Sequence, residues 1–116
     1  MDQFAAPTTA ILMMTNCPDR ETASQLARQL LEQQLAACVN ILPGMRSMYH
    51  WQGEIESADE VALLIKTTKL RYAQLEQTIK ALHPYQVPEI IALPIVAGSS
   101  DYLHWITQET SRNEDI

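Results

Sequence analysis

Two short runs of consecutive apolar residues constrain the fold of this 116-residue chain more than any other feature. Residues 10–14 read AILMM and residues 61–65 read VALLI, so every position in each run is apolar. A β-strand points alternate side chains to opposite faces of its sheet, so a strand without polar positions is typically buried on both faces. The two runs therefore predict two central strands of one sheet.

Apolar residues recur at helical spacing after each of these runs. The first helix is predicted from Pro18, which suits the first helical position, to about Gln34. A second helix is predicted over residues 72–82, where Pro84 stops it. A last short helix is predicted from Asp101.

The other hydrophobic segments are predicted to be extended. Residues 36–51 form one long predicted strand bent at Pro43, and a reversal at Gly53 leads into the second apolar run. Residues 89–97 are also strand-like, but Pro94 cannot donate a ladder hydrogen bond, which favours an edge position or a bulge. The predicted order is strand, helix, strand, strand, helix, strand, helix.

This order predicts an α+β, ferredoxin-like (split βαβ) antiparallel sheet with two helices on one face, an extended β-hairpin and a short C-terminal helix. The length suits a single domain over residues 1–116, with residues 1–8 and 111–116 expected to be flexible. Two helices cover only one face, so a closed homo-oligomer is expected to cover the other. The surplus strand length at residues 46–57 is expected to pair with a neighbouring subunit.

The composition excludes several classes of partner. Eight basic and 14 acidic residues give a net charge of -6, which repels nucleic acid and anionic lipid. No apolar stretch approaches the roughly 18 residues of a membrane span, and the N-terminus lacks the positive charge of a secretory signal. We therefore expect a cytoplasmic protein without nucleic-acid or membrane partners. Two cysteines and three widely spaced glycines predict reduced thiols and no organic cofactor.

Several short motifs occur in a fixed order along the chain. They are ACVNI at residues 37–41, then Ser47, Tyr49, Trp51 and Gly53, then KT at 66–67, HPY at 83–85, PEI at 88–90, Tyr102 and Trp105. Over residues 11–106 this set closely resembles the divalent-cation-tolerance (CutA) family. The resemblance implies a ferredoxin-like subunit, a stable homotrimer built by inter-subunit strand pairing, and a likeness to the PII signalling proteins. It also implies a role in tolerance of copper and other divalent metals.

The resemblance implies metal ligands as well, and this chain departs from the family's pattern at two of them. A bacterial member binds copper through a cysteine at the end of the first strand and two adjacent histidines before a Pro-Tyr pair. Here Thr15 stands at the cysteine position and Leu82 at the first histidine. His83, Cys17 and Cys38 remain as candidate ligands of copper or another divalent cation, since imidazole and thiolate both suit copper.

Each candidate ligand also has a simpler interpretation. Cys17 precedes a helix start, where the helix dipole lowers a thiol pKa, so it is predicted to be either the more reactive thiol or a capping residue. Cys38 lies in an apolar strand and is alternatively a small buried hydrophobe. His83 ends a helix, where it alternatively hydrogen-bonds the last carbonyl groups.

A ligand pocket is predicted from four residues that belong to the motifs or end a predicted strand. Trp51 and Tyr85, together with Lys66 and Glu89, are expected to line an inter-subunit cleft for a small anion or a metal complex. Alternatively, the aromatic residues anchor the core or an interface, and Lys66 and Glu89 form a mutual or inter-subunit ion pair. A nearby acidic run is expected to be a solvated hairpin tip: Glu54, Glu56, Asp59 and Glu60.

The function predicted from these observations is that of a cytoplasmic, homotrimeric divalent-cation tolerance protein. It is expected to bind copper or another divalent metal ion and to contribute to the response to metal ions. The alternative is a PII-like small-molecule sensor, or a trimeric assembly or scaffold module, without catalytic activity. An enzyme with a cysteine nucleophile is disfavoured because the sequence offers no third group to orient a histidine base.

Overall fold

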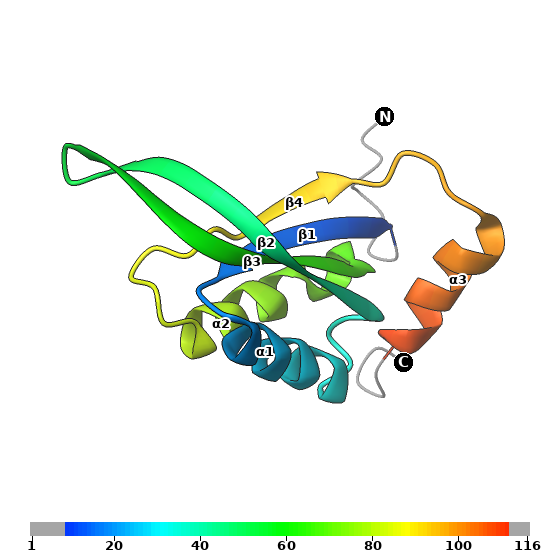
Figure 1. The fold of residues 1–116 in the computed structure, drawn as a ribbon. Helices are drawn as coiled ribbons and strands as arrows, with labels where there is room; N and C mark the ends of the chain where they lie inside the picture. Colours follow the sequence, from blue (N-terminus) through cyan, green and yellow to red (C-terminus); the bar gives the residue numbers. More distant parts are fainter. Residues whose placement is uncertain (1–8, 112–116) are drawn as a thin grey trace.

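The computed structural model describes residues 9–111, and most of both predicted flexible ends, 1–8 and 111–116, lies outside them. Residues 9–111 form four strands, three α-helices and one short 3-10 helix (Figure 1). In order these are β1 (Ala10–Cys17), α1 (Arg20–Glu32), β2 (Cys38–Trp51), β3 (Glu54–Thr68), η1 (Lys69–Arg71), α2 (Tyr72–Leu82), β4 (Ile91–Pro94) and α3 (Ser100–Glu109).

The four strands form one antiparallel sheet in the order β2-β3-β1-β4. The two apolar runs therefore occupy the central strands, as predicted, and Met13 in β1 faces Ile65 in β3. Pro94 ends β4, which lies at the edge of the sheet, as its missing N–H group predicts. This is the ferredoxin-like topology that the order of elements predicts.

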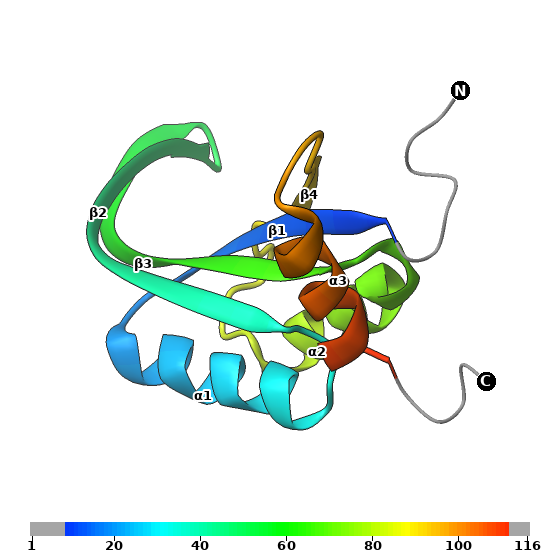
Figure 2. The ribbon, with the colours of Figure 1, turned by 90° about the vertical axis from the view of Figure 1, so that its right-hand side faces the viewer.

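Helices α1 and α2 lie on one face of the sheet, which we call the covered face (Figure 2). Alternate residues of β1 and β3 point to it and are fully buried, among them Met13, Leu63 and Ile65. They pack against apolar residues of the two helices: Ala23, Leu26, Leu30, Leu75 and Ile79. Because both central strands are apolar on this side except at Thr15 and Thr67, the subunit has a continuous hydrophobic core.

The first helix differs slightly from its prediction. It begins at Arg20 rather than Pro18, because Asp19 is the N-cap and its carboxylate accepts a hydrogen bond from the Thr22 backbone N–H at 2.7 Å. It ends at Glu32, two residues early, and Gln34 then adopts a positive φ of 56°. The side-chain cap, rather than proline, fixes where the helix starts.

The β2–β3 hairpin arches away from the helices beyond the rest of the sheet (Figure 2). Its register shifts between Leu42 and Met45, which confirms the predicted bend at Pro43, and Gly44 there has a φ of 84°. The turn consists of Gln52 and Gly53, both with positive φ, as a two-residue type I′ turn requires.

The opposite face of the sheet, which we call the open face, is covered only in part. Helix α3 contacts β3 and β1, and the Tyr102 hydroxyl interacts with Cys38 on this face. The Ser99 side chain caps α3 by accepting from the Tyr102 N–H at 3.1 Å. Beyond α3, apolar side chains of the sheet remain exposed: Leu42, Ile91 and Leu93. A large apolar surface of this kind typically marks an interface.

The last strand is shorter than predicted. Residues 89–97 were expected to be extended throughout, but β4 covers only Ile91–Pro94, so Glu89 precedes the strand. The segment from Pro84 to Pro88 is irregular because its prolines cannot donate backbone hydrogen bonds. This irregular segment forms one wall of the site described next.

Candidate functional site

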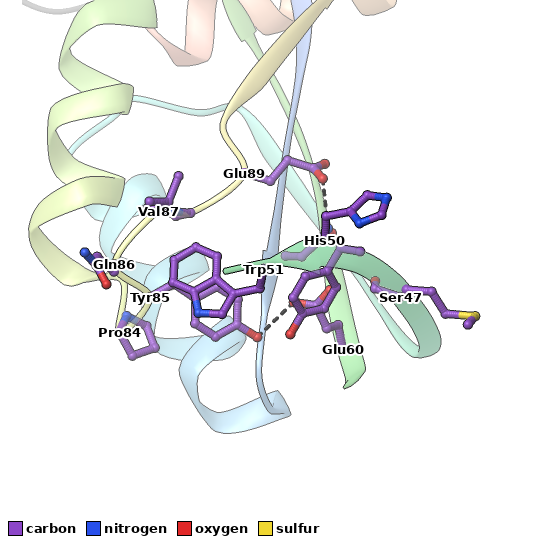
Figure 3. Close-up of a pocket in the computed structure, with 13 residues that line it drawn as sticks. Ser47, His50, Trp51, Glu60, Pro84, Tyr85, Gln86, Val87 and Glu89 are labelled. Atoms are coloured by element: carbon purple, nitrogen blue, oxygen red, sulfur yellow. Dashed lines mark hydrogen bonds between the residues drawn. The ribbon is translucent and has the colours of Figure 1, made fainter. Parts of the chain in front are cut away.

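A groove of about 840 Å³ lies between the hairpin and the irregular segment that follows α2 (Figure 3). Residues 47–51 of β2 form one wall and residues 84–89 form the other. Its lining combines aromatic, apolar and acidic side chains, including Tyr49, Trp51, Glu60, Tyr85, Val87 and Glu89. A volume of this size suits a small organic ligand, since such pockets span about 300–1,000 Å³.

The structure brings together three of the four residues of the predicted ligand pocket. Trp51, Tyr85 and Glu89 line the groove, whereas Lys66 does not. The Lys66 ammonium lies on the open face, where it donates to Asn40 Oδ1 and lies 3.8 Å from Cys38 Sγ. Its distance from the groove follows from strand register, which the sequence does not reveal.

Lys66 and Glu89 have separate partners within the subunit. Glu89 accepts a hydrogen bond from Asn16 Nδ2 at 3.2 Å, near the end of β1. Lys66 instead faces Leu12 of β1, four residues from Asn16, which corresponds to about 14 Å along the strand. The alternative of a Lys66–Glu89 ion pair is therefore not formed within the described subunit.

Glu60 belongs to the groove, and the expectation that it is a solvated hairpin residue was wrong. Its side chain is buried, at 8% exposure, and accepts a hydrogen bond from the Tyr85 hydroxyl at 2.8 Å. Burial raises the pKa of Tyr85, and the bond to Glu60 and the Glu60 charge raise it further. The position of Glu60 in the sequence could have indicated its burial, because Glu60 directly precedes the buried run that starts at Val61.

His83 anchors the irregular segment to β1. Its Nε2 lies 2.6 Å from the Asn16 carbonyl oxygen, and its Nδ1 accepts from the Tyr85 backbone N–H at 3.1 Å. These partners select the neutral tautomer with the proton on Nε2. The predicted alternative, a bond to the last carbonyls of its own helix, is replaced by this bond across to β1. Both ring nitrogens are engaged, so binding a metal requires one of these bonds to break.

The prediction that Cys17 is the more reactive thiol was wrong. Cys17 ends β1 on the covered face and is fully buried. Burial, reinforced by the negative charges of Asp19 and Glu60, raises its pKa to about 11. The expected lowering by a helix dipole does not occur, because loss of water around the thiol and two nearby carboxylates both oppose the thiolate.

Cys38 lies on the opposite face and at the opposite end of the sheet. It is half-buried, so it is not the fully buried hydrophobe of the alternative interpretation. Cys17 pairs with Val61 and Cys38 with Lys66, five residues apart on β3, which corresponds to about 17 Å. The three predicted metal ligands therefore do not converge in one subunit. Within residues 9–111, no cluster of three or more His, Cys, Asp or Glu residues is placed to hold a metal ion.

Together, the fold and the groove define a ferredoxin-like domain with a long hairpin, a partly open apolar sheet face and an acidic, aromatic-lined groove. The model of the CutA1 divalent ion tolerance protein family matches residues 11–109. The chain therefore belongs to the CutA1 family of divalent ion tolerance proteins, which confirms the resemblance seen in the sequence.

Individual relatives agree with this assignment. The divalent-cation tolerance protein CutA of Thermus thermophilus is 48% identical over 99 residues, 85% of this chain and 96% of that protein. The crystal structure of CutA from Xylella fastidiosa superposes with a TM-score of 0.86 at 42% identity, covering 89% of this chain and 99% of that one.

A third relative bears on cellular location. The CutA structure from Archaeoglobus fulgidus, described as a periplasmic divalent cation tolerance protein, has a TM-score of 0.86 at 38% identity, covering 88% of this chain and 99% of that one. In the described part of the present chain, none of the helices has the length and apolar character needed to cross a membrane.

Proposed function

We propose that this protein is a cytoplasmic homotrimer that binds copper or another divalent metal ion and contributes to the response to metal ions. Membership of the divalent ion tolerance family supports the metal role. The net charge of -6 favours the approach of cations. The proposal assigns no catalysis, since a buried thiol with a raised pKa such as Cys17 is a poor nucleophile.

The proposal rests on one observation about the subunit. Its predicted metal ligands lie too far apart to bind one ion together, and the same subunit exposes an apolar face of its sheet. Leu42, Ile91 and Leu93 are exposed on that face, and β2 and β4 are both edge strands. Association of three copies by strand pairing at these edges covers the apolar surface and brings side chains of different subunits together. We infer that the metal is held between subunits.

The candidate ligands differ in how easily they reach a metal. Cys38 faces the open side beside Lys66 and needs no change in the core to bind an ion. Cys17 and His83 take part only if a buried contact is given up. The proposal therefore ranks Cys38 first, and thiolate is a ligand that copper prefers.

Calorimetric titration with Cu²⁺, Cu⁺ and Zn²⁺ tests this proposal. We expect Cys38→Ala to weaken copper binding about tenfold or more, as loss of a thiolate ligand should. Cys17→Ala and His83→Ala should have smaller effects. Metal binding that none of the three substitutions changes would exclude these residues as ligands. Cell fractionation tests the cytoplasmic location, which recovery in a periplasmic or membrane fraction would contradict.

The groove supports a second candidate function, that of a PII-like small-molecule sensor. Its volume of about 840 Å³ and its aromatic lining suit a small organic ligand better than a bare ion. A ligand that binds only the folded protein raises the apparent melting temperature. A metabolite screen by thermal shift is therefore expected to give compounds whose effect disappears when Trp51 is replaced, and an empty screen counts against this function.

A further inference from the structure

The groove carries the negative charge of two carboxylates, and His50 is the only basic residue among its described lining residues. Glu60 and Glu89 both line it, and among the described lining residues there is no lysine or arginine. Arg46, nearby on the hairpin, is bound to Asp59 at 2.9 Å and to Ser57 at 2.9 Å. A small anion, which the sequence led us to expect, therefore meets two carboxylates and neither lysine nor arginine there, whereas a cation is attracted.

Aromatic rings on both walls add a second attraction for cations. Trp51 projects from the hairpin and Tyr85 from the facing segment (Figure 3), and Tyr49 of the hairpin also lines the groove. The negative face of an aromatic ring attracts an ammonium group, most strongly for tryptophan. Tyr85 is fixed in advance by two hydrogen bonds, from its hydroxyl to Glu60 and from its N–H to His83. Such preorganisation reduces the entropy lost on binding.

The carboxylates are arranged for an organic cation rather than for a metal ion. Glu60 and Glu89 lie apart in Figure 3, and each has its own partner, Tyr85 for Glu60 and Asn16 for Glu89. A metal ion needs several ligand atoms around one point, and no cluster of three or more His, Cys, Asp or Glu residues exists within residues 9–111. A larger molecule can place its charge near one carboxylate and its apolar body over the rings.

We propose that the groove binds an organic ammonium cation, with its apolar body against Trp51 and Tyr85 and its charged nitrogen near Glu89. This inference rests on the second candidate function, the small-molecule sensor, and names the chemical class of its ligand. It uses different groups from the metal proposal, because a protonated amine has no lone pair to coordinate and the groove residues that would hold it are not candidate metal ligands.

Three probes of nearly equal shape test the ligand class. Phenethylammonium, 2-phenylethanol and phenylacetate differ mainly in charge, so calorimetric titration of the full chain with each separates charge from shape. We expect phenethylammonium to bind at least about tenfold more tightly than the alcohol, and phenylacetate more weakly still. Equal binding of all three probes, or tightest binding of phenylacetate, overturns the inference.

Three variants locate the binding in the groove. Trp51→Leu keeps an apolar side chain without its ring face, and Glu89→Gln keeps a partner for Asn16 without its charge. Each is expected to weaken phenethylammonium binding about three- to thirtyfold. Glu109→Gln, at the exposed end of α3, removes the same charge outside the groove and should have no effect. Equal weakening by Glu109→Gln indicates a general charge effect and overturns the inference.

Titration of the same preparation with Cu²⁺ and Zn²⁺ separates this inference from the metal proposal. Metal binding without phenethylammonium binding overturns the organic-cation site and leaves the metal function intact. Phenethylammonium binding without metal binding supports the organic-cation site and overturns the metal function. If phenethylammonium fails but other metabolites bind and Trp51→Leu abolishes their binding, the sensor function stands and only the ligand class is wrong.

Discussion

The two faces of the sheet are built from similar residues but have different surroundings. Neighbouring residues such as Leu63 and Leu64, or Met13 and Met14, point to opposite faces. Leu63 and Met13, on the covered face, are fully buried, whereas Leu64 and Met14 on the open face are only half-buried. Apolar character alone therefore does not determine burial. The covered face is completed by α1 and α2, and the open face needs material from outside the subunit.

The two cysteines lie on different faces of the sheet and differ chemically for the same reason. Cys17 lies on the covered face, where burial and nearby carboxylates raise its pKa to about 11. Cys38 lies on the open face beside the Lys66 ammonium and the Tyr102 hydroxyl. One thiol is enclosed by the core, and the other faces the surface through which we propose that subunits associate.

The largest expected effect is on assembly through the open face. Leu93 is 39% exposed on β4, and Leu93→Asp places a carboxylate within the proposed trimer interface. A buried unpaired charge costs several kcal/mol, so the trimer should dissociate. Sedimentation should then give 13.1 kDa particles instead of particles of three times that mass.

Leu31→Asp is the matched control for this experiment. Leu31 is similarly exposed, at 42%, but lies on α1 away from the open face. This variant should keep the mass of the wild type. Wild-type protein that sediments at 13.1 kDa would contradict the proposal that other subunits cover the open face, since that face would then be stable in water.

The second effect concerns the core of the covered face. Leu63 is fully buried, and Leu63→Ala should lower the free energy of unfolding by about 2–5 kcal/mol through lost burial and a cavity. Leu31→Ala, at an exposed position, should lower it by less than about 1 kcal/mol. Urea unfolding measures both, and similar losses for the two variants would argue against a core confined to the covered face.

Much of the fold could be predicted from the sequence because its strongest signals are local. Continuous apolar runs predicted the central strands, Pro94 predicted the edge strand, and Gly53 predicted the turn. Each depends on properties of one short segment, such as a missing N–H or a tolerated positive φ. Only the ends of elements moved, for example where Asp19 rather than Pro18 starts α1.

The site was less predictable because it depends on which segments meet. Lys66 and Glu89 each lie near a strand end, but register places Lys66 beside Cys38 and Glu89 beside Asn16. Glu60 looks like part of an exposed acidic run until the Tyr85 segment folds over it. The pKa of Cys17 likewise follows from tertiary burial, which outweighs the effect expected from a nearby helix start.

The third effect is a loss of stability at alkaline pH caused by Cys17. Its pKa is about 11 in the folded chain, compared with an ordinary value of 9.0, so between these values the folded thiol stays protonated while the unfolded one ionises. The contribution of the protonated Cys17 thiol to the free energy of unfolding is therefore complete below about pH 9 and is lost as pH rises through about 11. The full loss amounts to about 2–3 kcal/mol.

Urea unfolding of wild type and Cys17→Ala across this pH range measures the Cys17 contribution. The tyrosines with raised pKa values and Cys38 are present in both proteins, so their titration largely cancels in the difference, and Cys17 is only the smallest of the causes that raise the pKa of Tyr85. The difference in unfolding free energy should shrink by about 2 kcal/mol between pH about 8.5 and pH about 11.5. A difference that stays constant with pH would show that the Cys17 thiol ionises equally in both states.

The smallest effect concerns two threonines on the covered face. Thr15 Oγ1 is buried without a hydrogen-bond partner in the described chain, whereas Thr67 Oγ1 donates to the Leu35 carbonyl at 2.7 Å. Valine has nearly the same shape, so Thr15→Val removes only an unpaired hydroxyl and should raise the unfolding free energy by about 1 kcal/mol. Thr67→Val leaves a carbonyl unpaired and should lower it by about 1–2 kcal/mol. Urea unfolding curves that shift in the same direction for both variants would show that hydrogen bonding does not distinguish these two positions.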